Sequence, residues 1–261
     1  MTDMQPVLDG PAGAPALVLG PSLGTDAALF DAQVSALADR YRTVRFNLPG
    51  HGRAPAPHGP YSMAGMARDV LALLRGEGIE RFHYAGVSIG GAIGLQLALD
   101  AGEQLASLTV CASSARFADP ASWPDRAATV REHGTRALLA SRPGTWYTHE
   151  FARNEPDEAE RLLDMLRATD PEGYAGCCEA IGAFDVRERL GEVRVPTLAL
   201  AGAEDPATPP EMLQQITDAV SGARLVVVPG TAHLLNVEAP ETVTRELACH
   251  LADADGEVDR G

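Results

Sequence analysis

A serine flanked by glycines is the first candidate for chemistry in this chain. The segment 86–90, Gly-Val-Ser-Ile-Gly, follows an apolar run at 82–85 and precedes a stretch that can begin a helix. A strand, a sharp turn and a helix form the setting that exposes a nucleophilic serine. The glycines fit such a turn, because neighbouring chain segments come too close for larger side chains. We expect Ser88 to be a nucleophile, and a serine in a tightly packed turn is the structural alternative.

A base and an acid that could activate this serine lie later in the chain. A serine hydroxyl becomes a good nucleophile when an imidazole accepts its proton and a carboxylate fixes the tautomer of that imidazole. Asp205 follows an apolar run at 197–201, and His233 lies just past another at 225–228. The order serine, acid, histidine is typical of hydrolases with a strand–turn–helix nucleophile. The spacing therefore predicts a catalytic triad of Ser88, Asp205 and His233.

Other acids and histidines are less well placed for these roles. Glu204 is adjacent to Asp205, and Asp185 lies upstream, so both stay open as the acid. The remaining histidines do not follow a late strand, and we expect surface or core positions for His51, His58, His83, His133, His149 and His250.

The tetrahedral intermediate of acyl transfer also needs backbone donors for its oxyanion. The residue after the nucleophile supplies one of them, so we expect the Ile89 amide in this role. The second should come from the loop after an early strand, and the segment 20–25, Gly-Pro-Ser-Leu-Gly-Thr, fits that position. Leu23 is the candidate donor, with an ordinary glycine-containing turn as the alternative.

The elements that must position these residues follow an alternating pattern. Apolar runs predict strands at 16–19, 43–46, 82–87, 105–111, 197–201 and 225–228. Asp26 and Ser62 can cap helices at 27–38 and 63–74, and Pro209-Pro210 can begin another. This order predicts a doubly wound, mostly parallel α/β sheet with helices on both faces and functional loops at the carboxyl ends of the strands.

The strand pattern disappears between about residues 117 and 190, where helical segments at 155–169 and 172–184 take over. An insertion of this kind between late strands predicts a helical cap over the strand ends, where open α/β sheets bind ligands. We expect a core formed by residues 1–116 and 191–261 and a cap formed by 117–190. The tail after residue 252 is expected to be frayed.

Composition excludes several classes of function. The 261 residues carry a net charge of −15 with no Lys/Arg-rich run, which argues against a nucleic acid or an anionic membrane as partner. No apolar stretch is long enough for a membrane span, and the first ten residues lack a secretory pattern, so we expect a cytoplasmic protein. The four cysteines have no metal or redox spacing, and we expect reduced thiols and no metal or cofactor.

Several segments resemble the α/β-hydrolase superfamily and, within it, the 3-oxoadipate enol-lactonases (EC 3.1.1.24) of the β-ketoadipate pathway of aromatic catabolism. The serine turn and Gly-His-Gly at 50–52 are shared across the superfamily. More discriminating are Ser-Leu-Gly-Thr-Asp at 22–26 and Glu-Gly-Tyr-Ala-Gly-Cys-Cys at 172–178. The resemblance implies the α/β-hydrolase fold and a serine esterase that opens a small anionic enol-lactone to 3-oxoadipate.

The sequence departs from the enol-lactonases in one segment that bears on the substrate. Asn-Leu-Pro at 47–49 stands where the enol-lactonases would have an Asp and an Arg, and it is the more generic hydrolase pattern. Few residues precede Val7, so we expect the first antiparallel strand to be short or absent. A carboxylesterase or a carbon–carbon bond hydrolase of the same fold stays open, as does a non-catalytic ligand-binding member.

The carboxylate of an anionic lactone needs a charge-assisted donor. Arg116, at the entrance to the cap, and Arg142 are the candidates, with a solvated surface arginine as the alternative for each. Trp146 could form an aromatic wall of the pocket, or be a packed cap aromatic.

Overall fold

A seven-stranded sheet forms the centre of the protein in the computed structural model, which describes residues 4–258. Its order is β1-β3-β2-β4-β5-β6-β7, with β1 antiparallel to β3 and all other neighbours parallel. The strands are β1 (Val7–Asp9), β2 (Ala16–Gly20), β3 (Arg42–Arg45), β4 (Phe82–Val87), β5 (Leu105–Cys111), β6 (Thr197–Gly202) and β7 (Arg224–Val228). The six expected strands are confirmed, each within one residue of the predicted bounds, and the first antiparallel strand is present but short.

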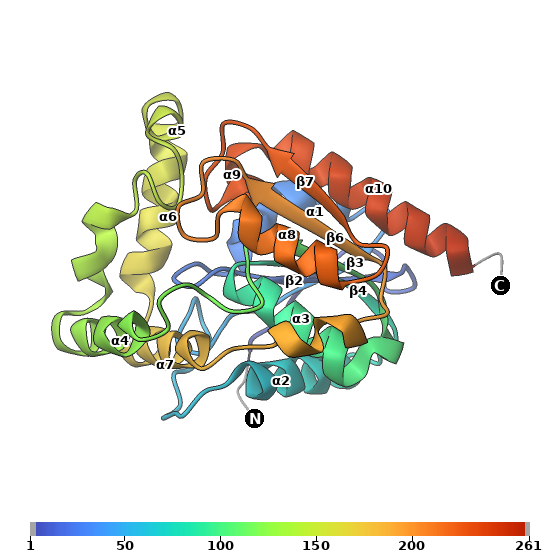
Figure 1. Ribbon diagram of the computed structural model, residues 1–261, viewed down its shortest axis with the longest axis horizontal. Coiled ribbons are helices and arrows are strands. Elements are labelled where there is room, and N and C mark those ends of the chain that lie inside the picture. The colour runs from blue at the N-terminus through green and yellow to red at the C-terminus, as the bar shows by residue number, and fades with distance from the viewer. Residues whose placement is uncertain (1–3, 259–261) are drawn as a thin grey trace.

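Helices cover both faces of this sheet (Figure 1). The helices of the core are α1 (Asp31–Leu37), α2 (Met63–Gly76), α3 (Ile89–Ala101), α8 (Pro210–Ala219), α9 (Leu235–Glu238) and α10 (Pro240–Val258). Asp26 accepts a hydrogen bond from the Ala28 amide, and Ser62 accepts one from the Gly65 amide, as the capping pattern predicts. The segment expected to be one helix begins as a 3₁₀ turn and continues as α1.

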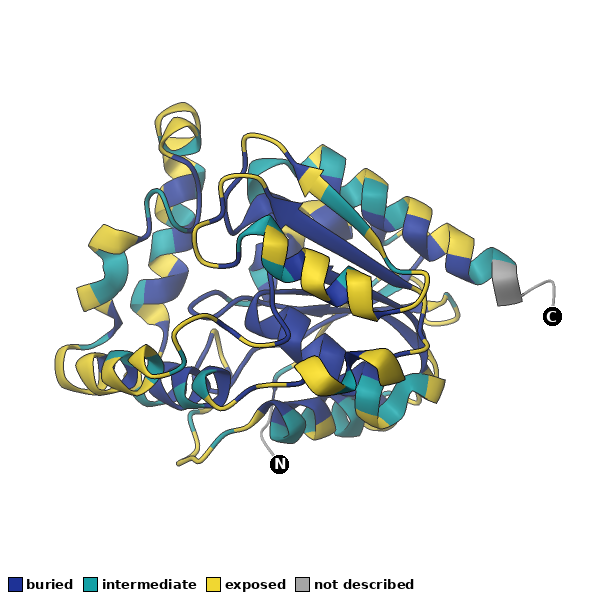
Figure 2. Cartoon of the chain, viewed as in Figure 1, coloured by how far each residue is buried: buried dark blue, intermediate teal, exposed yellow. Residues whose placement is uncertain are grey.

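Covering both faces explains why the central strands are apolar along their whole length. Every residue of β2, β4, β5 and β6 is buried, which Figure 2 shows as the dark centre of the molecule. At the edge, β7 has a neighbour on one side only, and Val227 is 43% exposed. The fold class predicted from the alternation of strands and helices is therefore confirmed.

A separate group of helices lies between β5 and β6 in the chain and beside the carboxyl ends of the strands (Figure 1). It consists of α4 (Ser122–His133), α5 (His149–Asn154), α6 (Pro156–Ala168) and α7 (Pro171–Gly182). The expected cap helices correspond to α6 and α7, and α4 packs against α7. The cap is thus inserted where the sequence predicts it, while its borders at 117 and 190 stay a prediction.

The C-terminal segment differs from the expectation of a frayed tail. Helix α10 continues to Val258, because Leu251 and Ala254 are buried against the core. The Asp255 carboxylate accepts hydrogen bonds from the Tyr41 hydroxyl at 3.0 Å and from His83 at 3.1 Å. Residues 259–261 lie outside the described part of the chain.

None of the four cysteines forms a disulfide within the described residues. Cys111, Cys177 and Cys178 are buried free thiols, and Cys249 is an exposed one. Burial raises the pKa of the Cys111 thiol to about 12, so this thiol stays protonated. Across residues 4–258, no helix is both long and apolar enough to cross a membrane.

Candidate active site

Ser88 is the single residue between the end of β4 and the start of α3. Its φ of 59° and ψ of −119° lie in a region that residues other than glycine rarely occupy. Two hydrogen bonds hold this strained turn: the Ser88 amide donates to the Cys111 carbonyl at 2.9 Å, and the Ser113 hydroxyl donates to the Ser88 carbonyl at 2.6 Å. Strain of this kind persists where the surroundings over-determine it, which is typical of functional sites.

The glycines on both sides of Ser88 are required by close backbone contacts. A Cβ on Gly90 would lie 2.2 Å from the Gly20 carbonyl oxygen, and a Cβ on Gly86 would lie 2.3 Å from the Gly90 carbonyl. The early loop after β2 therefore crosses directly over the first turn of α3. This crossing brings Leu23 and Ile89, the two predicted oxyanion donors, to the same end of the sheet.

His233 and Asp205 meet at the carboxyl ends of β6 and β7. His233 Nδ1 lies 2.8 Å from Asp205 Oδ2, and the Thr208 hydroxyl donates to the same carboxylate oxygen at 2.6 Å. The other oxygen accepts from the amides of Ala207 and Thr208, at 2.8 and 3.1 Å. With Nδ1–H donating to Asp205, Nε2 is the nitrogen left to accept a proton.

The Asp205 carboxyl is ionised across the neutral and weakly acidic range. Burial by itself would raise its pKa, but the charge of His233 and the hydrogen bonds from His233 and Thr208 outweigh burial and lower the pKa to about 2. The alternative acids lie elsewhere, because Glu204 is exposed and Asp185 pairs with Arg187 at 2.7 Å. Asp205 is therefore the carboxylate that contacts His233.

A cavity of about 140 Å³ joins the core and the cap at this point. Ser88, His233 and Leu23 line it from the core, and Arg142 and Trp146 line it from the cap. Asp205 is 3% exposed and lies behind His233. The structure thus brings Ser88 and His233 to one cavity, which the predicted cap residues Arg142 and Trp146 also line.

The loop that carries Leu23 is held by a histidine that we expected to be a surface or core residue. His51 is fully buried, its Nε2 accepts from the Gly24 amide at 2.9 Å, and its Nδ1 donates to the Pro49 carbonyl at 2.8 Å. Burial lowers the pKa of His51 to about 4, so the ring is neutral and can accept this bond. The Leu23 amide has no acceptor within the described residues. Ile89 is the first residue of α3, so its amide has no acceptor within that helix.

The two candidate arginines lie in different surroundings. Arg142 is 6% exposed, donates to the Leu138 carbonyl at 3.2 Å and to the Ser141 hydroxyl at 2.9 Å, and lies 5.4 Å from the Trp146 ring centre. Burial lowers the pKa of its guanidinium. Arg116 is exposed, lies 3.6 Å from an oxygen of Asp185 and does not line the cavity. Of the two candidates, Arg142 lines the cavity that contains Ser88 and Arg116 does not.

Two further residues that line the cavity, Arg126 and Thr208, were not predicted from the sequence. Arg126 of α4 lines the cavity with its guanidinium 5.4 Å from the Trp123 ring and 6.0 Å from the Tyr174 ring. An arginine on an exposed cap helix gives no such indication by itself. Thr208 could have been found from its position three residues after Asp205, where a hydroxyl and an amide can return to an aspartate.

The mostly parallel sheet, the strained serine between strand and helix, and the helical cap define the class of α/β hydrolases. The chain belongs to the alpha/beta hydrolase fold family, whose model matches residues 15–240.

Three relatives show where in this family the similarity is strong. The 3-oxoadipate enol-lactonase 2 of Acinetobacter baylyi is 33% identical over 232 residues, which cover 89% of this chain and 86% of the relative. A protein of Azorhizobium caulinodans named as a carbamate hydrolase, RutD, is 32% identical over 257 residues, with 94% and 93% covered. The crystal structure of the enol-lactonase from Burkholderia xenovorans LB400 superposes with a TM-score of 0.94 at 34% identity, covering 96% of this chain and 97% of that one.

Proposed function

We propose that this hydrolase opens the lactone ring of 3-oxoadipate enol-lactone, or of a small enol-lactone that likewise bears a carboxylate. The similarity to enol-lactonases over most of both chains supports this substrate class. The observation that carries the proposal is the buried guanidinium of Arg142 on the wall of the cavity that contains Ser88.

A comparison between two buried arginines shows why Arg142 indicates an anionic substrate. Arg45 is 8% exposed and pairs with both Asp9, at 2.8 Å, and Asp31, at 2.5 Å. Arg142 is equally buried but forms no ion pair within residues 4–258, and has a carbonyl, a hydroxyl and an aromatic ring as neighbours. A buried charge without a counter-charge is costly, so a substrate carboxylate that binds there would be favoured.

In the proposed reaction, the Ser88 hydroxyl attacks the lactone carbonyl while Nε2 of His233 accepts its proton. Asp205 keeps the proton on Nδ1 and stabilises the imidazolium, and the amides of Ile89 and Leu23 donate to the oxyanion. Collapse of the tetrahedral intermediate breaks the ring C–O bond, and His233 returns its proton to the enol oxygen. The enol then tautomerises to the ketone, while the acyl group stays on Ser88.

Water completes the reaction. His233 removes a proton from the water that attacks the acyl-enzyme, and then protonates Ser88 as the acid is released. The leaving group remains tethered to the acyl chain, so the site must hold the opened product without allowing the ring to close again. A cavity lined by both the core and the cap fits this requirement, and no metal or cofactor takes part in these steps.

A comparison of substrates and variants tests the proposal. We expect the purified protein to consume enzymatically generated enol-lactone with a higher kcat/KM than a neutral nitrophenyl ester, and Ser88→Ala to abolish both activities. Arg142→Met should lower kcat/KM for the enol-lactone about 30-fold, the loss expected for a charge-assisted hydrogen bond of about 2 kcal/mol, and change the neutral ester little.

Arg153→Met is the matched control, because Arg153 is an exposed arginine of the cap and should leave both rates unchanged. A strong preference for the neutral ester, or for a carbamate, would reject the enol-lactone and leave an esterase or another hydrolase of this family. Failure of a fluorophosphonate probe to label Ser88 in folded protein would instead indicate a non-catalytic binding protein.

A further inference from the structure

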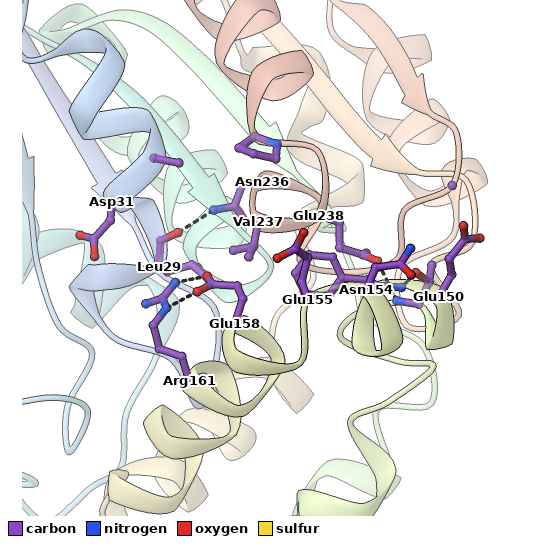
Figure 3. Close-up of a pocket in the computed structure, with 15 residues that line it drawn as sticks. Leu29, Asp31, Glu150, Asn154, Glu155, Glu158, Arg161, Asn236, Val237 and Glu238 are labelled. Atoms are coloured by element: carbon purple, nitrogen blue, oxygen red, sulfur yellow. Dashed lines mark hydrogen bonds and ion pairs between the residues drawn. The ribbon is translucent and has the colours of Figure 1, made fainter.

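Glu238, the last residue of α9, lies where the cap meets the loop that carries His233. One oxygen of its carboxylate accepts from the Thr148 amide of the cap at 2.7 Å, and the other accepts from the Ala232 amide at 2.5 Å. A cavity of about 700 Å³ between α5, α6 and the core exposes one side of this contact. Figure 3 shows the Glu238 side chain beside Val237, directed toward the yellow-green ribbon of the cap.

The loop at 229–234, here called the histidine loop, has three amides whose acceptors are in the cap or bound to it. The amide of Ala232 donates to Glu238, which also binds the cap. The next two amides donate directly to cap carbonyls: His233 to Thr145 at 3.3 Å, and Leu234 to Trp146 at 2.7 Å. Three consecutive amides around His233 are therefore satisfied by the cap or by a side chain that the cap shares.

Glu238 can act as a fixed support because α9 is attached to the core independently. The Asn236 side chain donates to the Leu29 carbonyl at 2.9 Å, a contact visible in Figure 3, and Gln33 of α1 donates to the Asn236 carbonyl at 3.0 Å. The carboxylate thus extends from an anchored helix to two other segments, the histidine loop and the cap segment that contains Thr148. Loss of the Glu238 carboxylate would remove a hydrogen-bond acceptor from both segments at once.

The ionised carboxylate of Glu238 is stabilised mainly by hydrogen bonds from two backbone amides, and not by a neighbouring positive charge. Burial raises the pKa of the Glu238 carboxyl, and the amides of Thr148 and Ala232 oppose that rise. The other charged residues that line the cavity beside it are mostly acidic, including Glu150 and Glu155, and the one arginine among them, Arg161, pairs with Glu158 instead. No cation pairs with Glu238 within the described residues, and the donors to its carboxylate are the backbone amides of Thr148 and Ala232.

We infer that Glu238 is a positioning residue for hydrolysis, which couples docking of the cap segment 145–148 to the placement of His233. This inference rests on the proposed role of His233 as the base. It also means that this segment stays attached to the core during turnover, because its displacement would remove the acceptors of the histidine loop.

Glu238→Gln tests the inference with almost no change of shape. Glutamine has one acceptor oxygen, so its NH₂ group would face one of the two amides as a second donor. We expect the rate constant for fluorophosphonate labelling of Ser88, and kcat for the ester, to fall about tenfold with KM within twofold, since small displacements of a reacting group are costly. Glu155→Gln, in the same cavity and exposed, should match the wild type.

Labelling separates this inference from the identity of the substrate, because it requires Ser88 and His233 but no enol-lactone. The low-field proton resonance of His233 Nδ1–H should shift or broaden in Glu238→Gln and not in Glu155→Gln. A wild-type labelling rate with an unchanged resonance would overturn the inference. A lower amplitude at an unchanged rate would also overturn it, because the folded molecules would then react as fast as the wild type. If Glu238→Gln does not fold, Glu238→Asp, one methylene too short to reach both amides, takes its place.

Discussion

At the scale of single residues, the site depends on groups that hold backbone atoms as much as on groups that react. His51 does not line the cavity, yet its neutral ring accepts from the Gly24 amide and so fixes the loop of Leu23. The same ring donates to the Pro49 carbonyl and stacks on Tyr174 at 6.4 Å, which leaves it one tautomer and one orientation. The loop that carries the Leu23 amide is thus held by a residue that lies outside the cavity.

Replacing His51 should therefore affect turnover more than binding. We expect His51→Ala to lower kcat at least tenfold with little change in KM, because a loosened oxyanion donor acts mainly on the transition state. His51→Gln should recover part of kcat, since its amide oxygen can accept from Gly24. Steady-state kinetics with a nitrophenyl ester measure both effects, and equal kcat values in all three proteins would contradict this role.

At the scale of elements, the cap is docked through close contacts of α7 with the loop that precedes His51. A Cβ on Gly173 would lie 2.4 Å from the Pro49 carbonyl oxygen and 2.6 Å from Gly50 Cα. The Asp170 amide, just before α7, donates to the Gly50 carbonyl at 2.8 Å. Gly173 therefore lets α7 approach the core closely enough for Tyr174 to reach the cavity.

Gly173→Ala should force α7 away from the loop that precedes His51. The clash is with backbone, which cannot rotate away, so we expect a loss of about 2 kcal/mol in the free energy of unfolding. Gly76→Ala is the matched control, because nothing lies within 4 Å of its Cβ at the end of α2. It should stabilise the protein by about 0.5 kcal/mol. Denaturant titrations of both variants give these values, and an equally stable Gly173→Ala would contradict the docking argument.

At the scale of the whole molecule, three buried histidines link the stability of the fold to pH. Burial lowers the pKa of His51 to about 4 and also lowers those of His83 and His250. For His83, the neighbouring Asp255 opposes the shift. In the unfolded chain these rings titrate near 6.5, so below that pH the unfolded state binds more protons than the folded state.

The protein should consequently lose stability as the pH falls from 6.5 toward 4. The loss expected from His51 alone is about 1 kcal/mol per pH unit, because the ring is fully buried. Thermal unfolding at pH 7.5 and pH 5.0 should show a lower Tm at pH 5.0, and His51→Gln should show a smaller difference. A Tm that is unchanged between the two values would contradict this linkage.

The sequence by itself determined the fold class and the central site candidates. The strands are buried on both faces, so their apolar runs stand out against the helices and the strand positions are accurate to about one residue. Ser88 directly follows such a strand, Asp205 and His233 come within five residues of the ends of theirs, and parallel strands place their carboxyl ends together. Their proximity therefore follows from chain order alone.

Only the tertiary structure decided which side chains complete the site. Arg116 and Arg142 look alike in sequence, but packing of the cap leaves one at the surface and buries the other beside Ser88. Glu238 meets the amide of Thr148, 90 positions away. Such contacts depend on how the cap docks on the core. The apolar face of a cap helix shows which side is buried, but it does not show which residues of the core that side contacts.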